Sequence, residues 1–125
     1  MDIDSLLASA RDLAEQGKSE ESRMCLLAVL KEHPDHLAAL LMLGGAYFVD
    51  TNYREARVVF ERLVNMKPGV GQYSVALFNT LINLQLVDDA LEEVRRFMSV
   101  ADKAAERETV EQYLSVLEQI ESARS

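Results

Sequence analysis

The chain has 125 residues, of which 49% are hydrophobic and 27% are charged, as in an ordinary globular domain. Its formal net charge of −8 opposes binding to nucleic-acid phosphates and to anionic lipid surfaces. The first residues lack the basic segment and apolar core of a secretory signal, and no apolar run reaches membrane-spanning length. We therefore expect a single cytoplasmic domain, residues 1–125, with neither nucleic-acid nor membrane partners.

The first predicted pair of helices occupies residues 3–36. Leu6, Leu13, Leu26 and Val29 supply apolar side chains at helical spacing. Gly17 takes the turn between the two helices, because a left-handed backbone conformation has little steric cost only for glycine.

The second predicted pair occupies residues 37–70 and begins after the first of two prolines. Pro34 and Pro68 each end a helix-like stretch, and the interval between them sets the period of the pattern. One apolar stripe of the leading helix contains Leu40, Leu43, Gly44 and Tyr47, and its partner carries Ala56, Phe60, Leu63 and Val64. A break at Thr51-Asn52 separates the two helices, so we expect an antiparallel hairpin.

The third predicted pair, residues 71–104, keeps the same spacing with Ser74, Leu77, Leu81, Ala90, Val94 and Phe97. It lacks the closing proline, and Phe78 stands where the second pair has Gly44, so we expect looser or shifted packing there.

A last amphipathic helix is predicted over about residues 102–123, with Asp102 as its N-cap. Its apolar stripe is Val110, Tyr113, Leu114, Leu117 and Ile120, while Glu106, Glu108, Glu111 and Glu118 are expected to face outward. This helix would cover the last apolar face of the array.

Residues 37–70 resemble a tetratricopeptide repeat, a helical hairpin of about 34 residues. The family pattern has a large residue, then Leu-Gly, Tyr, Ala, Phe and Pro. Here these places hold Leu40, Leu43-Gly44, Tyr47, Ala56, Phe60 and Pro68, and only Leu40 departs, where Trp is usual. The resemblance implies an all-α, right-handed α-solenoid of three hairpins (about 3–36, 37–70 and 71–104) plus a C-terminal capping helix, seven helices in all.

In this family the first helix of each pair lines a concave groove, and the resemblance turns four residues of each such helix inward. Eight of these are assigned to the peptide site: Leu7, Arg11, Leu41, Gly45, Phe48, Val75, Asn79 and Ile82. The other four are Asp4, Ala14, Ala38 and Gln72. Several of the eight are apolar, which suits a peptide site with a few polar groups that fix its register. Family members that grip the acidic tails of heat-shock chaperones need several basic groove residues. The matching positions here hold Leu7, Arg11, Met42, Gln72 and Ala76, of which only Arg11 is basic, so that function is not expected.

Catalytic, metal and cofactor sites are not expected. Cys25 lies in the middle of a predicted helix and is interpreted as a packing residue. His33 and His36 flank a proline turn and do not have the spacing of a zinc site. The acidic pairs Glu20-Glu21, Asp88-Asp89 and Glu92-Glu93 are interpreted as solvated surface.

Two functions follow from this pattern. The first is a non-enzymatic adaptor or chaperone-like module that binds a hydrophobic peptide or helix of a protein partner in the groove, similar in kind to small bacterial tetratricopeptide chaperones of secretion systems. The alternative is a structural module that assembles with itself into a homo-oligomer through the groove or the last helix.

Overall fold

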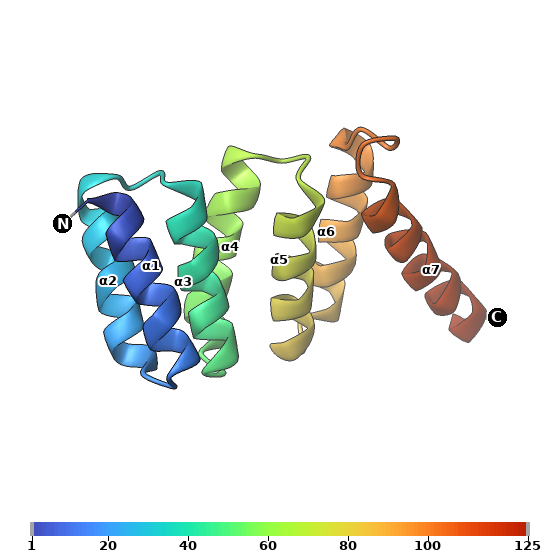
Figure 1. Cartoon of the computed structure of the whole chain (residues 1–125). Coiled ribbons are helices and arrows are strands. Elements are labelled where there is room, and N and C mark those ends of the chain that lie inside the picture. The colour runs from blue at the N-terminus through green and yellow to red at the C-terminus, as the bar shows by residue number, and fades with distance from the viewer. Residues whose placement is uncertain (1, 125) are drawn as a thin grey trace. The chain divides into compact units, whose positions relative to one another are not determined.

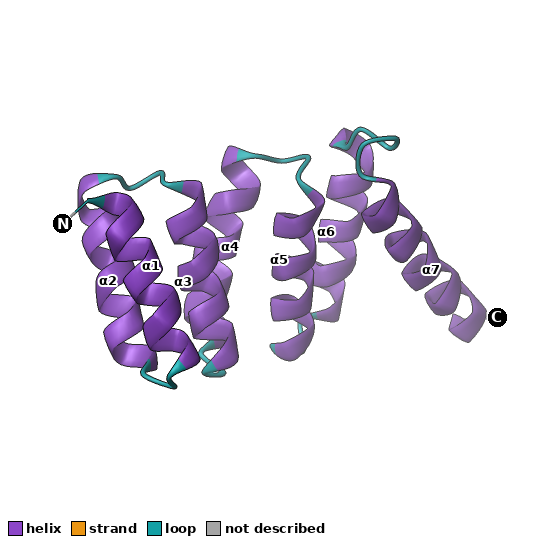
Figure 2. Ribbon diagram, in the orientation of Figure 1, coloured by secondary structure: helices purple, strands orange, loops and turns teal. Residues whose placement is uncertain are grey.

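The computed structural model describes residues 2–124, which form seven α-helices and contain no strand (Figure 1 and Figure 2). The helices are α1 (Ile3–Glu15), α2 (Ser19–Glu32), α3 (Leu37–Val49), α4 (Tyr53–Met66), α5 (Gly71–Asn83), α6 (Val87–Val100) and α7 (Arg107–Arg124). The predicted all-α fold with seven helices is confirmed. The chain divides into two compact units, the first ending at Leu63 and the second starting at Val64, within α4. The single domain stays a prediction.

The turns within the three pairs have the same backbone geometry at equivalent positions of the repeat. Gly17, Thr51 and Gln85 have φ values of 78°, 61° and 63°, in the left-handed region. The residue after each of them donates its N–H to a carbonyl five positions earlier: Lys18 to Leu13 and Asn52 to Tyr47, both at 2.8 Å, and Leu86 to Leu81 at 2.9 Å. The predicted turn at Gly17 is confirmed. Thr51 and Gln85 adopt this conformation at a cost of about 1–2 kcal/mol each.

The helices of the first unit approach closely where small residues stand. The Ser22 hydroxyl donates a hydrogen bond of 2.6 Å to the Ala10 carbonyl, which joins α2 to α1. A Cβ added at Gly44 would overlap the ring of Phe60, so α3 and α4 meet there with no room for a side chain. Ala10, Gly44 and Phe60 are all buried, as the repeat pattern predicts.

The third pair exchanges large and small residues at the equivalent contact. Phe78 and Val94 stand one repeat beyond Gly44 and Phe60, so the large side chain moves to the leading helix. Val94 is 0% exposed, and Phe78 packs against the apolar cluster that contains it. Phe78 also contacts the ring of Tyr113 on α7, with 5.6 Å between ring centroids. Of the two expected outcomes, looser or shifted packing, this exchange is a shift, in which the smaller Val94 and α7 accommodate Phe78.

Helix α7 covers the apolar face of α5 and α6 through Val110 and Tyr113, which are 8% and 1% exposed. The predicted start near Asp102 is wrong, since α7 begins at Arg107. Asp102 instead caps a turn that precedes the helix, and its carboxylate accepts the N–H groups of Ala104 and Ala105 at 3.0 and 3.1 Å. The capping chemistry expected of Asp102 is present, but it stabilises a turn rather than the helix end.

Glu106 does not face outward as predicted. Its two carboxylate oxygens accept the backbone N–H of Gly71 at 3.0 and 3.2 Å. This N–H opens α5 and has no partner within its own helix, so Glu106 satisfies it and lies favourably at the positive end of the helix dipole. The loop before α7 is thereby tied to α5.

Candidate peptide-binding site

The predicted groove residues lie on the first helix of each pair. Leu7 and Arg11 belong to α1 and Leu41, Gly45 and Phe48 to α3, in the first unit, while Val75, Asn79 and Ile82 belong to α5 in the second.

A cavity of about 430 Å³ opens in the first unit between α1, α2 and α3. Its α3 wall is an apolar stripe at i, i+3, i+4 and i+7: Met42, Gly45, Ala46 and Val49. Val49, at the edge of the cavity, is 78% exposed. The wall therefore combines three half-buried residues with one exposed apolar side chain, that of Val49.

The other walls of this cavity come from α1 and α2. Helix α1 contributes Arg11 and Ala14, and α2 contributes Ser19 and Ser22. The structure thus brings two of the predicted residues, Arg11 and Gly45, to one cavity.

Phe48, another predicted groove residue, packs edge-on against the ring of Tyr53, with 5.2 Å between ring centroids. Phe48 and Leu41 are both half-buried. Neither side chain lines the cavity, and neither does Leu7.

Sequence reasoning left Ala46 and Val49 out of the groove and considered Met42 only as a position matched to the tail-binding family members. The signal was present, because these three residues and Gly45 form a second apolar stripe on α3, beside the stripe of Leu40, Leu43, Gly44 and Tyr47 that packs inside the repeat. A helix that is apolar on two faces has one face more than its own hairpin needs.

Gly44 and Gly45 are neighbours with different surroundings. A Cβ at Gly44 would overlap Phe60, whereas a Cβ at Gly45 would meet nothing within 4 Å. Glycine in the interior of a helix costs roughly 1 kcal/mol relative to alanine. Packing explains that cost at Gly44 and leaves it unexplained at Gly45, where the missing side chain only enlarges the cavity.

Polar contacts hold α2 against α3 beside the cavity. Arg23 forms an ion pair with Asp50 and lies over the ring of Tyr47, 5.6 Å from its centroid. Ser19 donates a hydrogen bond of 3.1 Å to the same Asp50 carboxylate. These contacts fix the two helices whose side chains form the cavity walls.

In the second unit, the predicted groove residues differ in their availability. Val75 packs against the cluster built by α6 and α7, so α7 already covers it. Ile82 is 42% exposed, and Asn79 is exposed as well.

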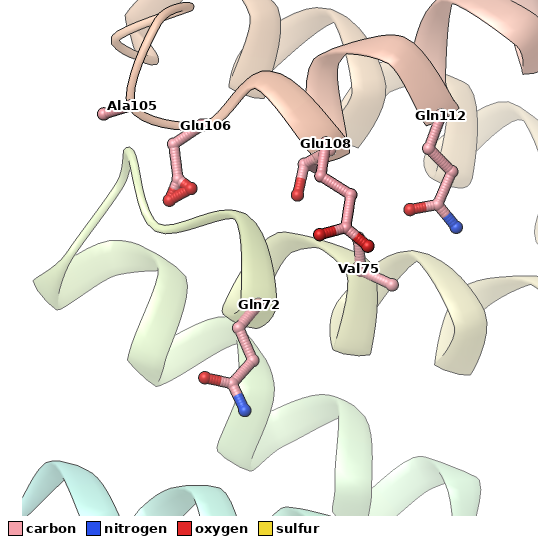
Figure 3. Close-up of a pocket in the computed structure, with 7 residues that line it drawn as sticks. Gln72, Val75, Ala105, Glu106, Glu108 and Gln112 are labelled. Carbon is pink, nitrogen blue, oxygen red and sulfur yellow. The ribbon is translucent and has the colours of Figure 1, made fainter.

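A second cavity, of about 380 Å³, lies between α5 and the region around the start of α7 (Figure 3). Gln72 and Val75 line it from α5, and Glu106, Glu108 and Gln112 line it from the other side. Glu108 and Gln112 point from α7 toward α5 (Figure 3). Carboxylates and amides dominate this lining, so it suits an apolar peptide less than the cavity of the first unit does.

A buried polar network links α5, α6 and α7. The Ser74 hydroxyl, 0% exposed, donates to Glu93 at 2.6 Å and lies 2.7 Å from the Tyr113 hydroxyl. Ser74 has only one proton, so Tyr113 donates to Ser74. Arg96 completes the chain by donating to both oxygens of Glu93, at 2.7 and 2.6 Å, and to the Pro68 carbonyl at 2.9 Å.

The interpretation of Glu93 as solvated surface is therefore wrong, since it is 6% exposed. Its partner Ser74 lies 19 residues away in sequence, and pairing with Arg96 offsets the cost of burying its charge. Burial raises the pKa of Tyr113 to about 12; the hydrogen bond with Ser74 opposes this rise and the charge of Glu93 adds to it.

His36 and Cys25, which were considered as metal-binding or catalytic residues, lie at the start of α3 and within α2. The Nδ1 atom of His36 accepts the N–H of Ala39 at 3.1 Å, so this side chain caps the start of α3. Cys25 is a half-buried free thiol. Within residues 2–124 no group of three or more His, Cys, Asp or Glu side chains is arranged to hold a metal ion. In the same part of the chain, no helix combines the length and apolar character needed to span a bilayer.

A family model for the tetratricopeptide repeat matches residues 4–36 and 38–68, which correspond to the first and second predicted repeats. The chain belongs to the tetratricopeptide repeat family. Among curated proteins, none matches it significantly.

Solved tetratricopeptide structures share the fold of this chain. The type III secretion translocator chaperone SycD of Yersinia enterocolitica is 18% identical, with a TM-score of 0.79 over 98% of this chain and 94% of that chain. The first tetratricopeptide region of Spaghetti (RPAP3), bound to an HSP90 peptide, is 14% identical, with a TM-score of 0.73 over 94% of each chain. MamA from Desulfovibrio magneticus RS-1 is 19% identical, with a TM-score of 0.71 over 99% of this chain and 78% of that chain.

Some similar proteins are much longer than this tetratricopeptide chain. It spans 57% of the chain of MamA MSR-1 and 19% of an O-GlcNAc transferase from Thermobaculum terrenum. The chain corresponds to only part of these proteins.

The two adjacent glycines of this tetratricopeptide hairpin should respond oppositely to a methyl group. We expect Gly45→Ala to raise the free energy of unfolding by about 1 kcal/mol, because helix propensity improves and nothing clashes. Gly44→Ala should lower it by about 2 kcal/mol, because the ring of Phe60 must move. Urea denaturation followed by circular dichroism measures both. Equal effects of the two substitutions would show that the packing described at Gly44 is wrong.

Tyr113 should make stability fall in alkaline solution. The folded state keeps this hydroxyl protonated up to about pH 12 and the unfolded chain only to about 10, so its contribution is complete below pH 10 and declines above it. In Tyr113→Phe we expect this decline to be shallower by at most about 1.4 kcal/mol per pH unit. Urea denaturation at increasing pH measures the difference. Tyr73→Phe, which removes a hydroxyl outside the network, is the control and should follow the wild type.

Proposed function

We propose that this chain is a non-enzymatic protein-interaction module that binds an apolar peptide or helix on the first helices of its pairs. The observation that carries the proposal is the open cavity over Gly45, beside the exposed Val49. An apolar concavity with few polar groups provides the surface area that peptide affinity requires.

The family supports this choice. SycD is a secretion translocator chaperone, and the Spaghetti region was solved with a bound peptide. Both share this fold over most of their length, so the fold is one that accommodates such partners. The O-GlcNAc transferase is an enzyme, but this chain corresponds to 19% of it, and the proposal includes no catalytic step.

In the first unit, the proposed contact centres on the cavity. Arg11 and Gly45 line this cavity, and we assign Leu7, Leu41 and Phe48 to the surrounding edge. In the second unit Asn79 and Ile82 are the groove residues that remain accessible, while Val75 is covered by α7.

Self-assembly is the second candidate function. Leu114 on α7 is 46% exposed and Val49 on α3 is 78% exposed, so each unit presents an apolar side chain that a second copy of the chain could cover. In this alternative, a second copy of the chain binds these apolar side chains in place of a peptide from another protein.

The cavity is tested by filling it. Peptides of random sequence, displayed on phage, are selected on the wild-type chain, and the tightest are synthesised with a fluorescent label. We expect Gly45→Leu to weaken their binding at least about tenfold, because the new side chain occupies the cavity, while Gly45→Ala changes affinity by less than about threefold. Fluorescence anisotropy measures each dissociation constant.

Thermal unfolding of both variants provides the control for folding, since neither substitution meets a neighbouring atom at Cβ. Selected peptides that bind Gly45→Leu as tightly as the wild type would exclude the cavity as the site. A chain that enriches no peptide and forms concentration-dependent dimers in light scattering would favour self-assembly instead.

A further inference from the structure

The polar groups at the cavity of the first unit differ in whether they have partners. Ser19 donates to Asp50 at 3.1 Å, and Ser22 donates to the Ala10 carbonyl at 2.6 Å. The guanidinium of Arg11 has no ion pair and no side-chain hydrogen bond with any residue of the described range 2–124. Arg11 is thus the polar group of this cavity that remains available to a ligand.

Five of the nine arginines form ion pairs with carboxylates, whereas Arg11, Arg54, Arg95 and Arg124 form none with a described residue. Among the residues that the structure describes, ion pairs are formed by Arg23, Arg57, Arg62, Arg96 and Arg107. Acidic residues outnumber basic ones by 21 to 13, so a carboxylate partner for an arginine is readily available. Of the four arginines without an ion pair in the described range, Arg11 is the one that lines the apolar cavity.

We propose that the segment bound in this cavity carries one carboxylate side chain beside large apolar side chains. Resting on the proposed function, this inference places the apolar side chains over Gly45 and against Val49, and the carboxylate on the guanidinium of Arg11. A planar guanidinium offers paired donors that match the two oxygens of a carboxylate. Charge complementarity with Arg11 therefore predicts an acidic residue in the ligand, which the apolar walls of the cavity alone would not predict.

The acidity of the chain limits the partner to a single carboxylate at this point. The chain has a net charge of −8, and Asp12 and Glu15 are exposed on α1 close to Arg11 in sequence. A second carboxylate on the ligand would find no further cation among the residues that line the cavity, in a chain whose net charge disfavours bound anions. An isolated acidic residue between apolar ones fits the site, whereas an acidic run does not.

A double-mutant cycle tests the pairing. The phage-selected peptides are made with and without their acidic residue, replaced by its amide, and are titrated against the wild type and Arg11→Gln by fluorescence anisotropy. We expect the amide to weaken binding to the wild type about tenfold and to have less than about a twofold effect on Arg11→Gln. Arg11→Lys, which keeps the charge but loses the paired donors, should fall between the two.

Arg95→Gln is the matched control, because Arg95 is an exposed arginine on α6 and its substitution changes the net charge equally. With Arg95→Gln, replacing the acidic residue of the peptide by its amide should still weaken binding about tenfold, as with the wild type. An equal loss with Arg95→Gln and Arg11→Gln would show a general charge effect and overturn the pairing.

The outcomes separate this inference from the function on which it rests. Selected peptides without an acidic residue, or an amide effect that persists in Arg11→Gln, would overturn the carboxylate assignment. If Gly45→Leu still abolished binding in that case, the proposed function would stand. Peptides indifferent to Gly45→Leu would overturn both.

Discussion

The close approach of two helices at Gly44 and Phe60 is the contact on which the first unit depends. The ring of Phe60 occupies the space that a side chain at Gly44 would need, so one face of α3 is committed to α4. Successive residues on a helix differ in direction by about 100°, so Gly45 faces elsewhere. The same contact that closes the hairpin therefore leaves a second apolar stripe of α3 turned toward α1 and the cavity.

The second unit differs from the first in that the large residue lies on the leading helix and a third helix, α7, packs against the pair. Its large residue at this contact is Phe78, which α7 helps to cover through Tyr113, and a buried network of Ser74, Glu93 and Arg96 holds that helix in place. Glu106 adds a cap on the first N–H of α5. Hydrogen bonds as well as apolar burial therefore hold α7 against α5 and α6. Val75 packs against the apolar cluster that α6 and α7 form, so α7 covers it.

Much of the fold could be predicted because its determinants are local. The repeated spacing of small and apolar residues, the turn at Gly17 and the His36 cap all depend on residues within a few positions of one another. Glu93 and Glu106 could not be placed, because their partners Ser74 and Gly71 lie 19 and 35 residues away and nothing local distinguishes a buried carboxylate from a solvated one. The family positions included Arg11 and Gly45 in the candidate site. The eight residues assigned to the groove did not include Met42, Ala46 and Val49, whose apolar stripe is specific to this sequence.

Both proposals require that a ligand occupies the first-unit cavity over Gly45. Amide chemical shifts of the isotopically labelled chain, recorded by nuclear magnetic resonance during titration with a phage-selected peptide, locate the bound ligand without any substitution. We predict the largest changes at Arg11, Gly45, Ala46 and Val49. Largest changes on α7, or at the exposed Met24 and Leu27 of α2, would contradict a ligand in this cavity.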